Sequence, residues 1–494
     1  MKNLYANIDP QKKWLIASIG LICFILYVVC LYFRPHESWC DDAFWADWAR
    51  QLAVHNRYYT TVWGGGHPSY SPLYVFFMAL WYKVVGFSFF AAQFPNICLT
   101  LITYLVLSLI LVGRKHVESW QGITCFSALY WFSPLMFWID NCGRIEVLCL
   151  MLGILTSYNF IRSVETGSNM HKIKLFIYGL LLFATGVEGV VFATLFIVIY
   201  SVYHYREAWQ SKILYIWHFG SYIASLCILG IITWSTHCLH QFFDTMFGFS
   251  KTFTSMYLYI RAFIKGAKHG EVVMERSQTT LTLKEPFFSS LINGYGLNIE
   301  YLAILVLLIV LFVLLCFKTN WKSVPRYIWV FVSMAIITPF IYVLAGRYVM
   351  YYTWAAYIPA IIALVLLLEQ LKTKWLSLSV GVLMLVWFFV SPNNFVLQSL
   401  DFTHDRDKQN IEDIAKVQID PNVPTCIPYS WYYYVVNDNE NIYFQGSGAY
   451  PENMRVIIYA QDEYNEEKFM NRYLLRERCR IGNKIVYDII LEKK

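Results

Sequence analysis

The stretch "KLFIYGLLLFATGVEGVVFATLFIVIYSVYHYR", Lys174 to Arg206, decides how this chain is organised. A helix needs about 20 apolar residues to cross a bilayer, so the apolar part of the stretch is too short for two full crossings. Basic residues nevertheless stand on both sides of it, and such residues collect on one side of a membrane. We therefore expect a hairpin of two helices, 175–187 and 190–203, with the glycines of "TGVEG" at its tip.

The composition of the whole chain is that of a membrane protein. Of its 494 residues, 57% are hydrophobic and only 15% are charged, whereas soluble domains are about a quarter charged. The mean hydropathy is +0.45. The net charge of +6 is spread between apolar runs and does not form one patch, which indicates membrane topology and argues against a nucleic-acid partner.

Hydropathy predicts about eleven membrane-spanning helices. The hairpin places every cluster of basic residues on the same side, so we expect a cytoplasmic N-terminus and a C-terminus on the outer side. The expected spans cover residues 14–33, 91–112, 120–138, 143–161, 175–187, 190–203, 213–234, 299–317, 327–344, 348–368 and 375–390.

Two domains follow from this pattern. Residues 1–391 form an α-helical polytopic membrane domain with outer loops at about 34–90 and 235–298. Residues 392–494 are more polar and alternate candidate helices (406–418 and 465–478) with strand-like runs (455–460 and 484–491), as a small extracytoplasmic α/β domain would. Cys426 and Cys479 both fall in this tail, and a disulfide between them is one possibility.

The first outer loop contains "SWCDDAFWADWARQL", residues 38–52. Its apolar residues recur at four-residue steps, which predicts a helix lying in the membrane interface, and residues 71–88 predict a second one. Asp41 and Asp42 stand at the start of the first of these helices. A carboxylate near hydrocarbon is costly, so the two are candidates for a functional site. The alternative is that they cap the helix.

Two further clusters are expected at the same outer level. Arg144 and Glu146 stand at the entrance of the fourth span, where the arginine either binds a phosphate or pairs with Asp140 or Glu146. Arg347 and Tyr348 begin the tenth span, where aromatic residues are also typical of the membrane interface.

Four more residues are weaker candidates. Lys83 lies on the second interfacial helix, and Glu188 lies at the hairpin tip. His67 and Tyr70 belong to the glycine-rich segment "WGGGHPSYSPLY". Acids, cations and aromatic rings on one face of a helical bundle suit a substrate that has a sugar, a phosphate and a lipid tail.

The first-loop stretches "DDAFWADWARQL" and "HPSYSPLYVFFMALWYKVVGFS" resemble the first outer loop of GT-C glycosyltransferases. "GRIEVLCLMLGILTSYNF" and "GRYVMYYTWAAYIPAIIALV" resemble later patterns of their bacterial aminoarabinose transferase and protein O-mannosyltransferase branch. The likeness covers about residues 14–390. One departure is "SYSPL", with His67 upstream, where relatives often have "PPL" after a basic residue.

The resemblance implies a polyprenyl-phosphate sugar donor, such as undecaprenyl phosphate, and inversion at the anomeric carbon. It makes Asp41 the base that activates the acceptor and Asp42 the second acid. Arg144, Lys83 and Arg347 become candidates for the donor phosphate, and the remaining candidates would line the substrate. No cofactor is expected, although related oligosaccharyl transferases hold a divalent metal at their acids. The implied location is a bacterial plasma membrane, with the site on the periplasmic side.

Two other classes of function remain open. A flippase or transporter of a lipid-linked sugar commonly shows internal repeats and charges near mid-bilayer, whereas we find no repeat here. A polymerase or ligase of surface polysaccharide would use a diphosphate-linked oligosaccharide as donor. The acceptor, which is a glycan, a lipid or a protein hydroxyl, does not follow from the sequence.

Overall fold

The computed structural model describes most of the membrane domain and the strands of the tail. The described residues are 5–33, 40–58, 71–140, 143–235, 273–276, 279–282, 299–318, 324–344, 350–390, 406–417, 419–420, 422–428, 431–436, 441–444, 454–459, 473–481 and 484–492.

The chain is mostly helical, and each predicted span corresponds to helix. Among the described residues, six helices are long and apolar enough to cross a membrane: α2 (Pro10–Phe33), α5 (Phe89–Gly113), α8 (Glu146–Thr166), α12 (Ile213–Ser235), α16 (Ile299–Lys318) and α18 (Trp354–Leu371). The others are shorter: α9 (Asn169–Thr185), α10 (Val187–Tyr203), α17 (Arg326–Leu344) and α19 (Lys374–Val390). The total of eleven crossings remains a prediction.

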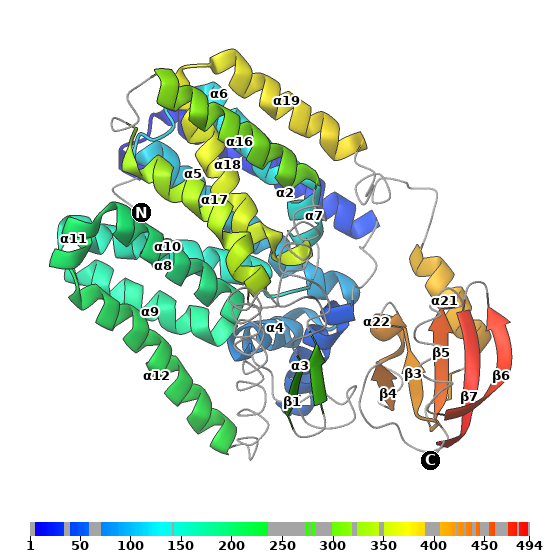
Figure 1. Ribbon diagram of the computed structural model, residues 1–494. Helices are drawn as coiled ribbons and strands as arrows, with labels where there is room; N and C mark the ends of the chain where they lie inside the picture. The colour runs from blue at the N-terminus through cyan, green and yellow to red at the C-terminus, as the bar shows by residue number, and fades with distance from the viewer. Residues whose placement is uncertain are drawn as a thin grey trace.

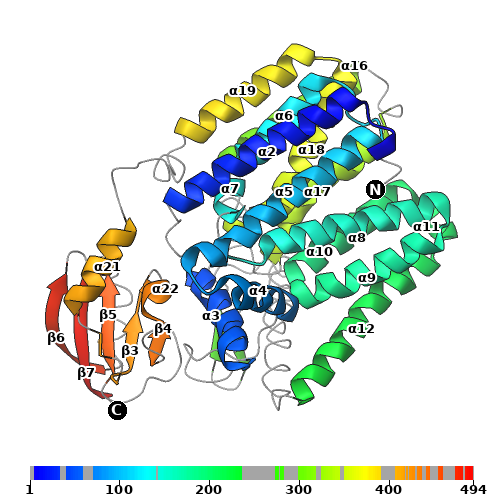
Figure 2. The same ribbon diagram turned by 180° about the vertical axis from the view of Figure 1, so that it is seen from behind.

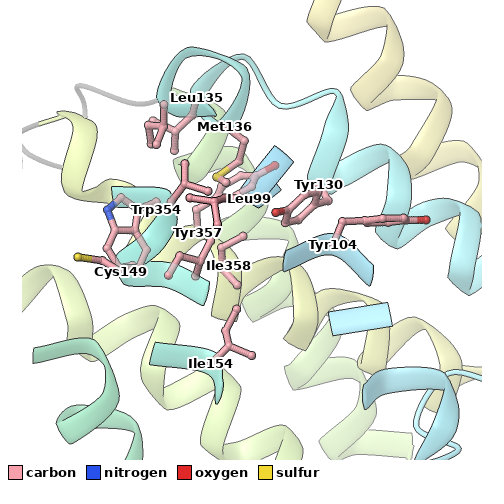
Figure 3. Packing of buried hydrophobic residues seen from close by; sticks show 14 of the residues in the cluster. Leu99, Tyr104, Tyr130, Leu135, Met136, Cys149, Ile154, Trp354, Tyr357 and Ile358 are labelled. Atoms are coloured by element: carbon pink, nitrogen blue, oxygen red, sulfur yellow. The ribbon is translucent and has the colours of Figure 1, made fainter. Parts of the chain in front are cut away.

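The predicted hairpin is confirmed. Helix α9 ends at Thr185, Gly186 is extended, and α10 begins at Val187. The two helices pack beside α8, which contacts both. Side chains of buried aromatic and aliphatic residues from α5, α6, α8 and α18 fill the centre of the bundle, where Figure 3 shows Tyr104 beside Tyr130 and Cys149 beside Trp354.

The third span differs from the prediction because it is broken. Its helix α6 (Trp120–Trp131) ends, and a short helix α7 (Pro134–Asp140) follows. Pro134 has no N–H to continue a helix, and it suits the first position of a new one. Ser133 accepts a hydrogen bond from Met136 N at 3.1 Å and so caps α7.

Two ends of the bundle can be distinguished. At one end, the basic end, ion pairs join Arg114 and Arg162 to Glu165 and Arg326 to Glu207, so these three arginines from separate predicted clusters lie together. The N-terminus and the short helix α11 (Tyr205–Gln210) lie there (Figure 1). Helices α3 (Cys40–His55) and α4 (Pro72–Val85) and the C-terminal sheet lie toward the other end, and Figure 2 shows α2 and α5 running side by side between the two ends.

Helix α3 is more buried than an interfacial helix would be. Its apolar residues pack against α4, and its polar residues Asp47, Arg50 and Gln51 are buried too. The polar face contacts the C-terminal domain and not water.

The C-terminal domain contains a five-stranded mixed sheet, in the order β4 (Ile442–Phe444), β3 (Thr425–Ile427), β5 (Arg455–Tyr459), β7 (Lys484–Glu492), β6 (Tyr473–Ile481). Strand β3 is parallel to β4 and β5, whereas β7 is antiparallel to β5 and β6. Helix α21 (Arg406–Val417) and the short α22 (Tyr432–Val435) complete the domain, which confirms the predicted α/β class. A separate pair of short strands, β1 (Val273–Arg276) and β2 (Thr279–Thr282), forms a hairpin.

Two predictions for this domain are wrong. Residues 473–478, expected in a helix, belong to β6, because the strand pairs along its whole length with β7. The possible disulfide is also wrong. Strands β5 and β7 lie between Cys426 on β3 and Cys479 on β6, and three strand spacings of about 4.8 Å exceed the reach of a disulfide. Cys426 is a buried free thiol.

Candidate active site

The two predicted catalytic acids lie at the start of α3. Asp41 and Asp42 fall in the first turn of this helix, which begins at Cys40; their side chains are outside the described part of the chain. One turn further on, the ring of Trp45 is buried and meets Tyr74 of α4, with 6.3 Å between the ring centroids. The first turn of α3 is therefore fixed against α4.

A chain of contacts connects this turn to the entrance of α8. The Tyr74 hydroxyl donates to Asn96 Oδ1 at 3.4 Å, and Asn96 Nδ2 donates to the backbone oxygen of Arg144 at 2.7 Å. Gly143 lies against α5, where a Cβ on it would be 3.0 Å from the carbonyl oxygen of Ala92. This close approach needs glycine, and it brings Arg144 to the same end of the bundle as the two acids.

Arg144 and Glu146 form a buried ion pair. Arg144 Nη2 lies 2.7 Å from Glu146 Oε1, and Arg144 Nε donates to both carboxylate oxygens at 3.1 and 3.2 Å. Their side chains are only 5% and 2% exposed. Of the two alternatives from the sequence, pairing with Glu146 is therefore realised. A phosphate that bound this guanidinium would share it with the Glu146 carboxylate. The buried ion pair also holds the Arg144 side chain in one orientation.

Glu188 is held beside this ion pair by two tyrosines. Tyr352 donates its hydroxyl to Glu188 Oε1 at 3.1 Å, and Tyr342 donates to the Glu188 backbone oxygen at 3.0 Å. Gly186 lies close to both groups. A Cβ added to it would be 3.0 Å from Glu188 Oε2 and also 3.0 Å from the side chain of Ile145, the residue between Arg144 and Glu146. The hairpin tip thus closes on the entrance of α8, which brings the candidate Glu188 next to the ion pair of Arg144 and Glu146.

Two more carboxyls at this end are buried: Asp140, which the sequence analysis named as a possible partner of Arg144, and Glu300, which it did not name. Asp140, the last residue of α7, is fully buried. The nearby Thr100 hydroxyl donates to Asn96 O at 2.9 Å, so it offers no proton to Asp140, whose oxygens have no hydrogen-bond donor among the described residues. Glu300, in the first turn of α16, accepts from Leu135 N at 3.4 Å. The sequence signal that identifies both residues is an acidic side chain directly before or after an apolar run.

Lys83 lies away from this cluster. It is in the last turn of α4 and its ammonium group donates to Asn56 Oδ1 at 3.4 Å, just after the end of α3. From Asp41 to His55, α3 advances about 20 Å at 1.5 Å per residue. The structure therefore brings Lys83 to the opposite end of α3 from the two acids.

The four remaining candidates, His67, Tyr70, Arg347 and Tyr348, lie outside the described residues.

The C-terminal domain holds α3 from the side opposite to α4. The Tyr432 hydroxyl donates to Asp47 Oδ1 at 2.6 Å, and Arg50 Nη2 donates to the Val436 backbone oxygen at 3.0 Å. The ring of Phe87, between α4 and α5, stacks on Tyr433 with 5.6 Å between centroids. Burial, and then the charge of Asp47, raise the pKa of Tyr432 well above its ordinary value, so this tyrosine keeps its proton and remains a donor.

Chemically, this end of the bundle offers a guanidinium, several carboxyls and aromatic rings around the first turn of α3. Acids there can accept a proton from a hydroxyl, and the cation can stabilise a leaving phosphate. The neighbouring rings of Trp45, Trp48 and Phe44 form an aromatic wall, with 3.8 Å between the centroids of Phe44 and Trp48.

No family model and no curated protein matches this chain. Among solved structures, the chain is similar to ArnT from Cupriavidus metallidurans bound to undecaprenyl phosphate. The TM-score is 0.44 at 10% identity, over 96% of this chain and 97% of that one. The apo state of the same protein matches over 97% and 98%, also with a TM-score of 0.44. Arabinosyltransferase EmbB from Mycobacterium smegmatis matches with a TM-score of 0.37 at 12% identity, over 94% of this chain and 45% of that one.

Proposed function

We propose that this chain is an inverting glycosyltransferase that moves a sugar from a polyprenyl-phosphate donor to an acceptor hydroxyl on the outer face of a bacterial plasma membrane. Asp41 is the general base in this proposal, and Asp42 orients it or caps α3. Arg144 binds the donor phosphate, with Arg347 as a second cation. Membrane lipid surrounds the donor tail, and the acceptor is a glycan, a lipid or a protein.

One observation carries this proposal: the contacts from Trp45 through Tyr74 and Asn96 to Arg144 join the helix of the two acids to the buried cation. Base and phosphate-binding group must lie on either side of one sugar. In this proposal the base stands in the first turn of α3, and the phosphate-binding arginine lies two residues before α8. Asp41 and Arg144 also belong to the sequence motifs that resemble GT-C glycosyltransferases, and these motifs follow one another along this chain in the order that the resemblance implies.

In the proposed reaction, Asp41 takes the proton of the acceptor hydroxyl as that oxygen attacks the anomeric carbon. The bond from this carbon to the phosphate oxygen breaks on the opposite face, which inverts the configuration. The polyprenyl phosphate leaves with the bonding electron pair, and Arg144 stabilises its charge. A buried guanidinium already oriented by Glu146 needs no reorganisation when that charge appears.

The test is transfer by the purified full-length protein, supplied with a labelled sugar on polyprenyl monophosphate or an oligosaccharide on polyprenyl diphosphate, together with envelope extract as the source of acceptor. We expect product from the monophosphate donor only, and none with Asp41→Asn, although that variant still binds polyprenyl phosphate. Asp9→Asn, at the N-terminal end of α2, is the matched control. Product only from the diphosphate donor would indicate a polymerase or ligase, and retained activity of Asp41→Asn would exclude Asp41 as the base.

A further inference from the structure

A cavity of about 170 Å³ lies between five helices, α5, α8, α10, α17 and α18, at the basic end of the bundle. Its inner part is lined by apolar side chains such as Ile154, Phe192 and Ile358, and Figure 3 shows Ile154 and Ile358 within the buried core. Its mouth is lined by Arg114 and Glu165. Glu146, in the proposed active site, is about 28 Å from Glu165 along α8, so the cavity is a separate feature.

The depth of the cavity matches one leaflet of a bilayer. Ile154 and Glu165 both line it and are eleven residues apart on α8, which corresponds to about 16 Å of helix. The hydrocarbon core of a membrane is about 30 Å thick, so the cavity reaches from one surface to about mid-bilayer. An acyl chain of that leaflet extends over the same depth.

The charge at the mouth is positive. Arg114 and Arg162 both pair with the one carboxylate of Glu165, Arg162 at 2.9 Å, so one positive charge is left over. His116 and His204 also line the mouth, where burial lowers the pKa of both rings and keeps them uncharged at neutral pH. The excess charge therefore belongs to the guanidinium groups, which suit an anionic group.

One hydroxyl inside the cavity is left without a partner. Ser157 is 5% exposed and lines the cavity, and its Oγ makes no hydrogen bond to a described residue. The adjacent Thr156 instead donates to Leu152 O at 2.8 Å, as helix hydroxyls usually do. A buried polar group normally has a partner, so the position of Ser157 indicates that the cavity holds an occupant.

We propose that this cavity binds one acyl chain of an anionic phospholipid from the leaflet at the basic end, with the phosphate headgroup at Arg114. A negatively charged leaflet attracts basic segments, and among the described residues Arg114, Arg162 and Arg326 all lie at that end. The cavity takes a single chain of one leaflet. It stops about halfway through the bilayer, too early for a polyprenyl tail that continues past the midplane.

The test is photolabelling of the full-length protein in phosphatidylcholine nanodiscs that contain a small fraction of phosphatidylglycerol with a diazirine on its acyl chain. Labelled peptides are mapped by mass spectrometry. We expect labelling of α8 and α10 around Ile154 and Phe192. Loss of one surface cation weakens such binding about fivefold, so Arg114→Gln should lower the labelling by about that factor. Ser157→Phe, which fills the cavity, should reduce it to background.

Arg326→Gln is the matched control, since Arg326 also pairs with a glutamate at the basic end but does not line the cavity; its labelling should stay unchanged. If Ser157→Phe fails to give a monodisperse protein, Ile154→Phe fills the same space. Equal labelling by a phosphatidylcholine probe, labelling that survives cavity filling, or no labelling above background would each overturn the proposal. Stronger labelling by a polyprenyl-phosphate probe would overturn the proposal by identifying polyprenyl phosphate, and not a phospholipid, as the occupant of the cavity.

Discussion

The hydrogen bond between Tyr432 and Asp47 gives the sharpest prediction, because it joins residues 385 positions apart and both are fully buried. Tyr432→Phe removes one donor to the Asp47 carboxylate, which also accepts from Gln51 Nε2 at 3.5 Å. A hydrogen bond to a charged group contributes about 1.5–3 kcal/mol. We therefore expect the C-terminal domain to dock on α3 about 2 kcal/mol more weakly, which is about a 30-fold change in the docking equilibrium.

Hydrogen exchange followed by mass spectrometry measures this directly. Amide protection in the peptides that cover α3 and residues 431–436 should fall by up to that factor, whereas protection in α18 should not change. Because α3 also carries Asp41 and Asp42, the rate of sugar transfer at saturating donor should fall with it. Tyr443→Phe, on β4 of the same domain and packed in the cluster of the other sheet face, is the control.

Asp47→Asn keeps an acceptor for Tyr432 but removes the charge, so its effect on protection should be smaller than that of Tyr432→Phe. The double variant should resemble Tyr432→Phe alone, since both changes act on one bond. Unchanged exchange in α3 after Tyr432→Phe would show that this bond does not hold the helix. Changed exchange with unchanged transfer would show that the position of α3 does not limit catalysis.

Three further results are expected. Glu146→Gln leaves Arg144 buried without its charge partner and should destabilise the protein by about 3–5 kcal/mol; the double variant Glu146→Gln/Arg144→Gln should recover part of that in thermal unfolding. Burial, and then the charge of a neighbouring arginine, lower the pKa of His116 to about 4 from 6.5, so stability should fall as the pH drops through this interval, and His116→Phe should flatten the decline. Cys426 should stay unmodified by a thiol reagent in the folded protein, with or without reductant, and should react after unfolding, as mass spectrometry of its peptide would show.

The helices of the membrane domain could be predicted because a bilayer imposes one length and one composition on every span. Lys172 and Lys212, on either side of the apolar stretch, predicted a hairpin of two helices there. Hydropathy averaged over that stretch does not distinguish one helix from two. The break between α6 and α7 was readable too, since Pro134 interrupts the apolar run. Residues 120–138 together have the length of a single span, so hydropathy alone does not show this break.

The tail was harder because its elements depend on partners distant in sequence. Residues 473–478 contain leucine, arginine and glutamate, which favour helix in isolation. The antiparallel register with β7 overrides that preference. For the same reason, two cysteines in one small domain did not reveal that two strands separate them. In the site, Arg144 and Glu146 could be named from the sequence, but the choice between phosphate and carboxylate as the partner of Arg144 needed coordinates.

The burial of α3 on both faces changes how the two acids of the first loop should be understood. An interfacial helix would leave Asp47 and Arg50 in water, and its position would follow the lipid surface. Here α4 covers one face of the helix, and Tyr432 and Val436 of the C-terminal domain cover the other. A general base acts only when it is held within a fraction of an ångström of its proton. A helix fixed from two sides by protein meets this requirement, so in the proposed mechanism the tail positions the two acids by holding α3.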